Sequence, residues 1–312
     1  MIKFGVLLAV ALASSVAQAG VIDLGAIMGG ANVYTARDFT AISSDVEGAI
    51  VSGGNVKIES YAVNLNNKAA YAGYSIVAGG DISLTSGTIH NGQTYAGGTT
   101  TLKNAPAAPL STVNPVDFAA ASQQFRDIAA GLSLVGATGS IEREYSANKV
   151  IGSGKGGVDV FSVSADFFNG GNNWKLAGLT PGQTLIFNIS GKHGGFNNGN
   201  IGFDPLAGYN VLFNFFEAET VDVKGIIGSV LAPYATVQAG WGVINGQVIA
   251  DTWNSSVQVN SNHYFKPVDV AGFELVKDDP PIETPSEVPE PGTAALMMAG
   301  LAGALALRRR RA

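Results

Sequence analysis

The sequence predicts a mostly β protein, a discontinuous β-solenoid of β-helix-like coils with one long α-helix packed alongside. Three observations predict it. A glycine-containing strand pattern recurs at short intervals, one stretch has strong helical periodicity, and the composition is rich in glycine, with 41 of 312 residues, but poor in charge, at 13%. Because there is no cysteine, stability must come from packing and backbone ladders rather than from disulfides.

The recurring pattern reads apolar or aromatic residue, small residue, Gly-Gly, polar residue and then an alternating strand. Copies begin at Val51, Val77 and Tyr95, which are 26 and 18 residues apart. Such a step is typical of a solenoid coil, and we expect the Gly-Gly pairs to supply corners with positive φ. The 18-residue step returns between Val230 and Val248, so coils flank the helix on both sides. Ordinary β-hairpins with glycine turns remain the alternative.

The helix is expected at about residues 115–135. Asn114 is a suitable N-cap and Pro115 suits the first helical position. Apolar residues follow at steps of three and four, which indicates one stripe that packs on the sheet. These residues are Phe118, Ala121, Phe125, Ile128, Leu132 and Val135.

The N-terminus predicts a Sec-type signal peptide over residues 1–19. A lysine precedes an apolar run, and Ala17 and Ala19 form a small-residue cleavage site, so the mature chain is expected to begin at Gly20. Signal peptidase is the implied partner. The domain is expected over residues 20–277.

Residues 278–287 form a proline-rich acidic linker, which is expected to be extended. The tail, residues 288–312, begins with Pro289-Glu290-Pro291, continues with a 14-residue apolar segment at 294–307 and ends with a cluster of arginines. The apolar segment is shorter than the roughly 20 residues of a comfortable membrane span, so a transient transmembrane helix at the inner membrane is expected. The cluster predicts a cytoplasmic stop; it consists of Arg308, Arg309, Arg310 and Arg311.

Charge limits the partners. Without the two terminal signals, 13 Lys and Arg stand against 23 Asp and Glu, a net charge close to −10. This argues against nucleic acid and anionic lipid as ligands. It fits a soluble surface or matrix protein.

The tail resembles the PEP-CTERM sorting signal, because the Pro289-Glu290-Pro291 motif, the apolar segment and the arginines follow in that order. The resemblance implies recognition by an exosortase.

The body, roughly residues 30 to 266, resembles the choice-of-anchor A domain. The resemblance rests on seven segments. They are Asp45-Val46-Glu47-Gly48 with Ser52-Gly53-Gly54-Asn55, Val77 to Ile82, Pro115 to Phe118, Gly228 to Pro233 with Ile244 to Ala250, and Asn262-His263-Tyr264-Phe265. The plan of a broken solenoid beside a long helix is also similar to bacterial ice-binding solenoids. The family brings no catalytic residues and no cofactor with it.

The sequence gives no sign of an enzyme. Its three histidines, His90, His193 and His263, lack ligand spacing, and no metal or cofactor is expected. Acidic residues are scattered rather than clustered; they include Asp159, Asp166, Asp204 and Asp222. A calcium loop at residues 197–204 is an alternative, although the repeated acidic pattern is missing.

The sequence contains residues typical of two kinds of ligand surface. Thr99, Thr100 and Thr101 stand together, but matching threonines are not expected one coil away, which argues against ice binding. Trp241 and Trp253 are candidates for carbohydrate contact by stacking, with core packing as the alternative.

The function predicted is that of an exported, non-enzymatic cell-surface or extracellular-matrix protein of a Gram-negative bacterium, associated with exopolysaccharide or biofilm. That association comes from the resemblance. A carbohydrate- or ice-binding adhesin and a β-solenoid glycan lyase or hydrolase are the alternatives.

Overall fold

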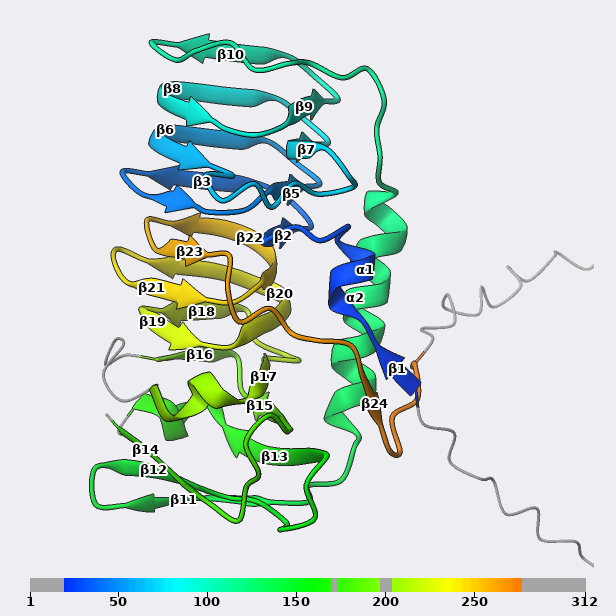
Figure 1. The fold of residues 1–312 in the computed structure, drawn as a ribbon, viewed down its shortest axis with the longest axis vertical. Helices are drawn as coiled ribbons and strands as arrows, with labels where there is room; N and C mark the ends of the chain where they lie inside the picture. The colour runs from blue at the N-terminus through cyan, green and yellow to red at the C-terminus, as the bar shows by residue number, and fades with distance from the viewer. Residues whose placement is uncertain (1–19, 170–172, 197–203, 277–312) are drawn as a thin grey trace, which may run out of the picture. The chain divides into compact units, whose positions relative to one another are not determined.

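The computed structural model describes residues 20–169, 173–196 and 204–276. The described part is mostly β, and its strands form layers stacked from β10 to β11, with helix α2 running along one side (Figure 1). Three parallel ladders, each on a different side of the stack, contain most of the strands.

The first ladder lies against α2, and we name it the helix face. Each strand pairs in parallel with the next. In stacking order, the strands are β13 (Val158–Ser164), β15 (Thr184–Ser190), β17 (Asn210–Asn214), the first part of β20 (Ser229–Ala239) and of β22 (Val248–Ser255), β2 (Val33–Thr35), β5 (Ile50–Ser52), β7 (Tyr74–Ala78) and β9 (Gln93–Ala96).

The second ladder, named the open face, is parallel as well. Its strands are β16 (His193–Phe196), β18 (Thr220–Val223), the second parts of β20 and β22, β3 (Phe39–Ile42), the first parts of β6 (Val56–Val63) and β8 (Ile82–Ile89), and β10 (Thr100–Lys103).

The third ladder completes each layer, and we name it the third face. It consists of β19 (Gly225–Ile227), β21 (Val243–Asn245), β23 (Gln258–Asn260), β4 (Asp45–Val46) and the ends of β6 and β8.

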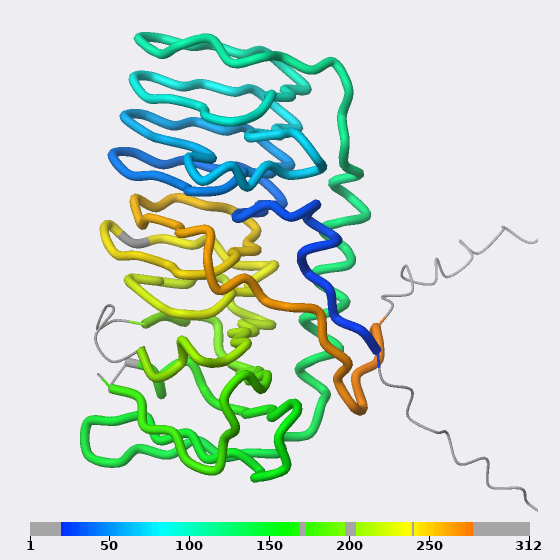
Figure 2. Tube along the Cα trace, viewed as in Figure 1, coloured from blue at the N-terminus to red at the C-terminus, as the bar shows by residue number. Residues whose placement is uncertain are grey.

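The chain enters this stack in its middle. β2 pairs with β5 on one side and with β22 on the other, so Val33 lies beside both Ile50 and Val248. The early and late parts of the chain therefore meet in adjacent layers (Figure 2). The sequence copies are in register, with Val51 opposite Val77 and Val77 opposite Tyr95.

The expected role of the Gly-Gly pairs was wrong, because none of these glycines has positive φ. They are needed for close stacking instead. A Cβ on Gly79 would clash with the backbone oxygen of Gly53, and a Cβ on Gly97 would clash with that of Gly79. Positive φ occurs at other corners, at Ser60 and Ser86.

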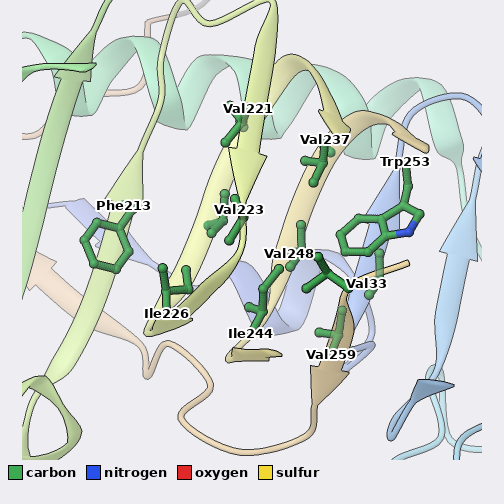
Figure 3. Close-up of a cluster of buried hydrophobic side chains, with 14 of the residues drawn as sticks. Val33, Phe213, Val221, Val223, Ile226, Val237, Ile244, Val248, Trp253 and Val259 are labelled. Atoms are coloured by element: carbon green, nitrogen blue, oxygen red, sulfur yellow. The ribbon is translucent and has the colours of Figure 1, made fainter. Parts of the chain in front are cut away.

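One core fills the space between the three ladders. Val248 from the helix face, Val237 from the open face and Ile244 from the third face all point into it (Figure 3). Phe187 stacks on Phe213 at 5.2 Å in the adjacent layer. Because successive side chains of a strand point to opposite sides of the sheet, alternate side chains of each strand point into this core.

A second core lies between the helix face and α2 (Phe118–Ser133). Five residues of the expected stripe are buried: Ala121, Phe125, Ile128, Leu132 and Val135. Tyr34 packs on Phe125, with ring centroids 4.9 Å apart.

The expected start of the helix was wrong. Asp117 is the N-cap, and its Oδ1 accepts from the Ala120 amide at 3.0 Å. Asn114 caps a turn instead, since its Oδ1 accepts from the Val116 amide. Pro115 therefore precedes the helix.

The remaining elements are short. β1 (Gly20–Ile22) pairs antiparallel with β24 (Val268–Val270). Another sheet contains three strands, β11 (Ser140–Glu144), β12 (Ala147–Ile151) and β14 (Asn173–Ala177). The short helices are α1 (Leu24–Ile27), η1 (Ala165–Asn169) and η2 (Asp204–Gly208).

Candidate functional site

The open face carries a row of threonines. Thr220 lies opposite Thr236, and Thr236 lies opposite Thr252, in three consecutive layers. All three are partly exposed. Since adjacent strands are about 4.8 Å apart, the three threonines recur at a regular interval; the Thr252 hydroxyl donates to Asp251 Oδ2 and the Thr220 hydroxyl contacts His193 Nδ1. We name Thr220, Thr236 and Thr252 the threonine row.

The expectation that Thr99–Thr101 have no matching threonines one coil away is confirmed by the register of β10 and β8, but the threonine row lies elsewhere and was not expected. The step is 16 residues rather than 18, and it lies far from Thr99–Thr101 in the sequence. The sequence contains a signal of this row, because each threonine is followed by an apolar residue and then a polar one, as in Thr252-Trp253-Asn254. Thr101 itself pairs with Ser83 rather than with a threonine.

A second polar row runs beside the first over six layers. It is formed by side chains two positions further along each strand, on the same side of the sheet. Its members lie opposite one another in the order Gln238, Asn254, Thr40, Lys57, Ser83 and Thr101. Together the rows give the open face a polar surface that is continuous from layer to layer.

Two shallow depressions cross this surface, and Thr40, Ala41 and Ile42 line both. The larger has a volume of about 190 Å³ and extends toward Asn254 and Ser256. The smaller, of about 50 Å³, extends the other way, toward Lys57. The open face is thus corrugated rather than hollowed, which suits a ligand that extends over several layers.

Side chains at one corner of the layers fix their spacing. Asp38 Oδ1 accepts from the Asn55 amide at 2.7 Å, and Asn55 Oδ1 accepts from the Asp81 amide at 2.9 Å. Asp81 Oδ1 in turn accepts from the amide of Thr99 at 2.6 Å and from its hydroxyl at 3.0 Å, and these bonds lower the pKa of Asp81. Each layer therefore caps the next at the edge of the open face.

The two tryptophan candidates differ in exposure. Trp253 is fully buried and stacks on Phe39 at 5.5 Å, and its Nε1 donates to the Ser255 carbonyl, so its assignment as a carbohydrate contact was wrong. Trp241 is 62% exposed, and Lys224 Nζ lies 5.7 Å from its ring centroid. Trp241 stays a candidate, at the corner between the open and third faces.

The acidic residues do not converge. No group of three or more potential metal ligands occurs among the described residues. Asp159 is buried, and its carboxylate accepts from Thr138 Oγ1 and from Gln183 Nε2, both at 2.8 Å. Burial alone would raise its pKa, but these bonds and those from Ser153 outweigh burial and lower it. Asp159 is thus a structural carboxylate.

The terminal signals lie outside the described residues. This applies to Ala17 and Ala19, to Pro289-Glu290-Pro291, to the apolar segment at 294–307 and to the arginines at 308–311. Gly20, the expected mature N-terminus, is described and begins β1. Within residues 20–169, 173–196 and 204–276, no helix is long and apolar enough to cross a membrane.

Comparison with protein families gives two matches. A family model described as "Putative Ice-binding-like adhesive domain" matches residues 25–261, which include all three faces and α2. A model of the PEP-CTERM protein-sorting motif matches residues 287–311. Comparison with curated proteins and with solved structures gives no match.

Proposed function

This chain belongs to the ice-binding-like adhesive domain family, and from that premise we propose that it is an exported, non-enzymatic surface protein that binds an extended ligand through its open face. The sorting motif at residues 287–311 implies processing by an exosortase and export to the cell envelope or surface. The observation that carries the proposal is the register of the open face, where like side chains repeat in consecutive layers.

The architecture supports a binding rather than a catalytic role. We interpret the three parallel ladders as a discontinuous β-solenoid, of the kind expected for a choice-of-anchor A domain. α2 covers the helix face, whereas the open face bears polar, partly exposed side chains. A rigid, repetitive surface matches a polymer or an ordered surface better than a small substrate, and extracellular polysaccharide of a biofilm matrix is the ligand proposed.

The proposed route begins with Sec-type export and cleavage by signal peptidase between Ala19 and Gly20. The apolar segment at 294–307 would then hold the chain briefly at the inner membrane, with Arg308–Arg311 on the cytoplasmic side. Exosortase would act near Pro289-Glu290-Pro291. The mature protein would reach the outer surface or the matrix of a Gram-negative bacterium.

Cell fractionation tests this route. In the producing cells, we expect replacement of Pro289, Glu290 and Pro291 by alanine to leave an unprocessed form at the inner membrane and to reduce the surface form. Replacement of the neighbouring Thr293 by alanine is the matched control and should change little. Unchanged processing and location in the triple variant would rule out the sorting role.

Ice is a second candidate ligand, favoured by one observation, the threonine row. Regular hydroxyl groups at about 4.8 Å provide an ordered array for water. If ice is the ligand, the purified protein should inhibit ice recrystallisation, and Thr236→Tyr should abolish the inhibition because its ring interrupts the row. Absence of inhibition in the wild-type protein would dismiss this candidate and leave the polysaccharide.

A further inference from the structure

A groove lies at the corner between the helix face and the open face, beside the first turns of α2. Its volume is about 580 Å³, within the range of small-molecule sites. Its chemistry differs from that of the open face, because two arginines contribute to it. Its lining includes Arg37, Phe118, Ser122, Gln123, Arg126 and Asp251.

Arg126 is the central feature of the groove. Its Nε is buried and has no hydrogen-bond partner in the described part of the chain. The guanidinium carbon lies 5.8 Å from the ring centroid of Tyr234, which holds the group in place. Arg126 forms no ion pair with any described residue. Because Arg126 is partly exposed and lines the groove, a ligand there would accept from the rest of its guanidinium, whereas the buried Nε is closed to it.

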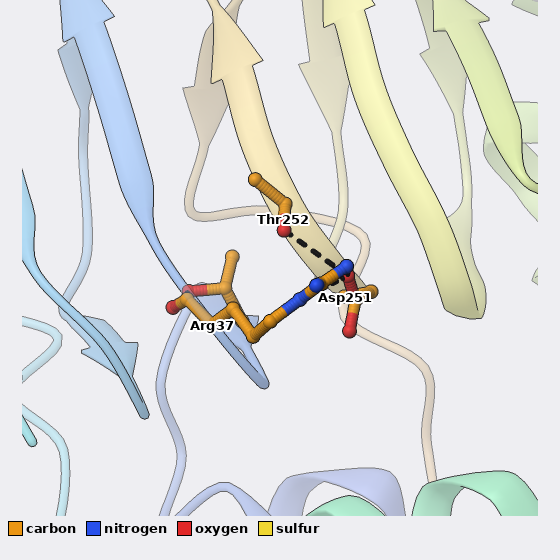
Figure 4. A network of polar contacts seen from close by, with 4 residues as sticks. Arg37, Asp251 and Thr252 are labelled. Atoms are coloured by element: carbon orange, nitrogen blue, oxygen red, sulfur yellow. Dashed lines mark hydrogen bonds and ion pairs between the residues drawn. The ribbon is translucent and has the colours of Figure 1, made fainter.

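Arg37, unlike Arg126, has an ion-pair partner among the described residues. It forms an ion pair with Asp251, whose Oδ2 accepts from Arg37 Nε at 2.7 Å and from Thr252 Oγ1 at 3.1 Å (Figure 4). The charge of Asp251 is therefore offset by Arg37. This leaves the positive charge of Arg126 uncompensated within the lining of the groove.

The acidic residues near the groove are engaged elsewhere. Asp117 caps the helix by accepting from the Ala120 amide, and Asp127 accepts from Gln123 Nε2 at 2.8 Å. Asp38 accepts from the amide of Asn55 in the adjacent layer. No ion pair joins any of the three to Arg126.

We propose that this groove binds the carboxylate of an acidic saccharide, a uronate residue, on the guanidinium of Arg126. The planar fork of a guanidinium matches a carboxylate in two-point hydrogen bonding. The Gln123 side-chain carbonyl and the Phe118 ring, both in the lining, offer one polar and one apolar contact to a sugar ring, whereas the Ser122 hydroxyl is paired with the Tyr34 hydroxyl at 2.8 Å. The net charge of the exported part, close to −10, disfavours polyanions in general, so a uronate would bind only where a local positive charge such as that of Arg126 is available.

This site goes beyond the proposed function, which places the ligand on the open face. The two are separable by experiment, because Arg126 belongs to α2 and the threonine row belongs to β18, β20 and β22. Loss of binding at one need not affect the other.

Isothermal titration of the mature protein with oligogalacturonate tests the proposal, and the methyl ester of the same oligosaccharide is the uncharged control. We expect the acid form to bind and the ester not to bind. Arg126→Met should weaken binding of the acid form at least tenfold, and Arg126→Lys should weaken it less. Arg143→Met is the matched control and should leave binding unchanged. Arg143 lies on β11, outside the groove lining, and packs over the ring of Phe167.

The proposal would be overturned by absence of binding by the acid form or by equal binding of acid and ester. Unchanged binding by Arg126→Met with an unchanged melting temperature would overturn it as well. Equal affinity for oligoglutamate would also overturn it, because the groove would then recognise acidic peptide rather than sugar. Thr236→Tyr should retain oligogalacturonate binding, which separates this result from failure of the open-face proposal.

Discussion

At the residue scale, the molecule depends on a few positions where a small chemical change has a large effect. Asp159 is one, because its buried carboxylate is paired with Thr138, Ser153 and Gln183. The stacking glycines are others, because the next layer lies against their hydrogen atoms. At both kinds of position, segments that are separated in the sequence come into direct contact.

We predict that Asp159→Asn lowers the free energy of unfolding at neutral pH by about 1–3 kcal/mol, because donors to a charged acceptor lose their partner. Urea denaturation measures this. Asp166→Asn is the control, because Asp166 is exposed, and it should have little effect. Equal stability of the Asp159→Asn variant and the wild-type protein would contradict the structural role of this carboxylate.

The same group predicts a pH dependence. Its folded pKa lies below the unfolded value, which is about 3.9. The ionised form is therefore favoured by folding, and its contribution is present above pH about 4 and lost as pH falls through the lower folded pKa. We expect the stability difference between wild type and Asp159→Asn to be constant above pH about 5 and to shrink below pH about 4. A difference that grew on acidification would have the wrong sign.

Gly79→Ala is predicted to destabilise the protein by several kcal/mol, or to prevent folding, because its Cβ would meet the backbone of Gly53 rather than a flexible side chain. Gly136→Ala is the control, since nothing lies within 4 Å of its added Cβ. Thermal melting compares the two. A Gly79→Ala variant as stable as wild type would show that the layers are less closely stacked.

At the scale of elements, helix α2 is the cover of the helix face. Besides its apolar stripe, it accepts one hydrogen bond at its start, from Tyr34 Oη to the Phe118 carbonyl at 3.1 Å, and two more in its C-terminal half. Asn188 Nδ2 donates to the Leu132 carbonyl at 2.6 Å, and Asn214 Nδ2 donates to that of Ala129 at 3.0 Å. These bonds fix the position of the C-terminal half of α2 along the stack.

Phe125→Ala is predicted to lower the free energy of unfolding by about 3–5 kcal/mol, because the Phe125 side chain of α2 is fully buried and packs on Tyr34 of the helix face. Hydrogen exchange should show faster exchange in α2 and in the strands of the helix face than in the third face. Gln124→Ala, at an exposed position, should leave exchange unchanged. Uniform destabilisation of every strand would mean that α2 unfolds only together with the stack.

The helix and the repeats could be predicted because their signals are local. The stripe of α2 has a regular spacing, and the Gly-Gly copies share their order of residues. The start of α2 was misplaced because Asn114 and Asp117 are both good caps, and the choice depends on the preceding extended segment. The threonine row does not follow from the Gly-Gly copies, because it steps by 16 residues while the copies step by 18 and 26.

The candidate site was less predictable for a physical reason. Trp241 and Trp253 both lie among small or polar residues, yet only the pleat of β22 decides that Trp253 points inward. The sequence does not mark Arg126 as a binding residue, because a charged residue on an amphipathic helix is usually solvated. Its buried Nε depends on the corner formed by distant segments of the chain.

At the scale of the whole molecule, the described stack presents a covered face and an open one. Entry of the chain in the middle of the stack places the threonine row next to the polar row that continues through β3, β6 and β8. The open face therefore extends over layers from both ends of the sequence. We take this continuous surface to be the functional part of the exported protein.

The most direct test is retention of the purified mature protein on extracellular matrix from the producing cells. The variants are Thr236→Tyr on the open face and, as the matched control, Thr88→Tyr on the third face, where Thr88 lies in β8. Both must first show wild-type melting. We predict that Thr236→Tyr lowers retention about tenfold or more and that Thr88→Tyr retains the wild-type value. Equal retention of both variants, at the wild-type level, would contradict binding through the open face.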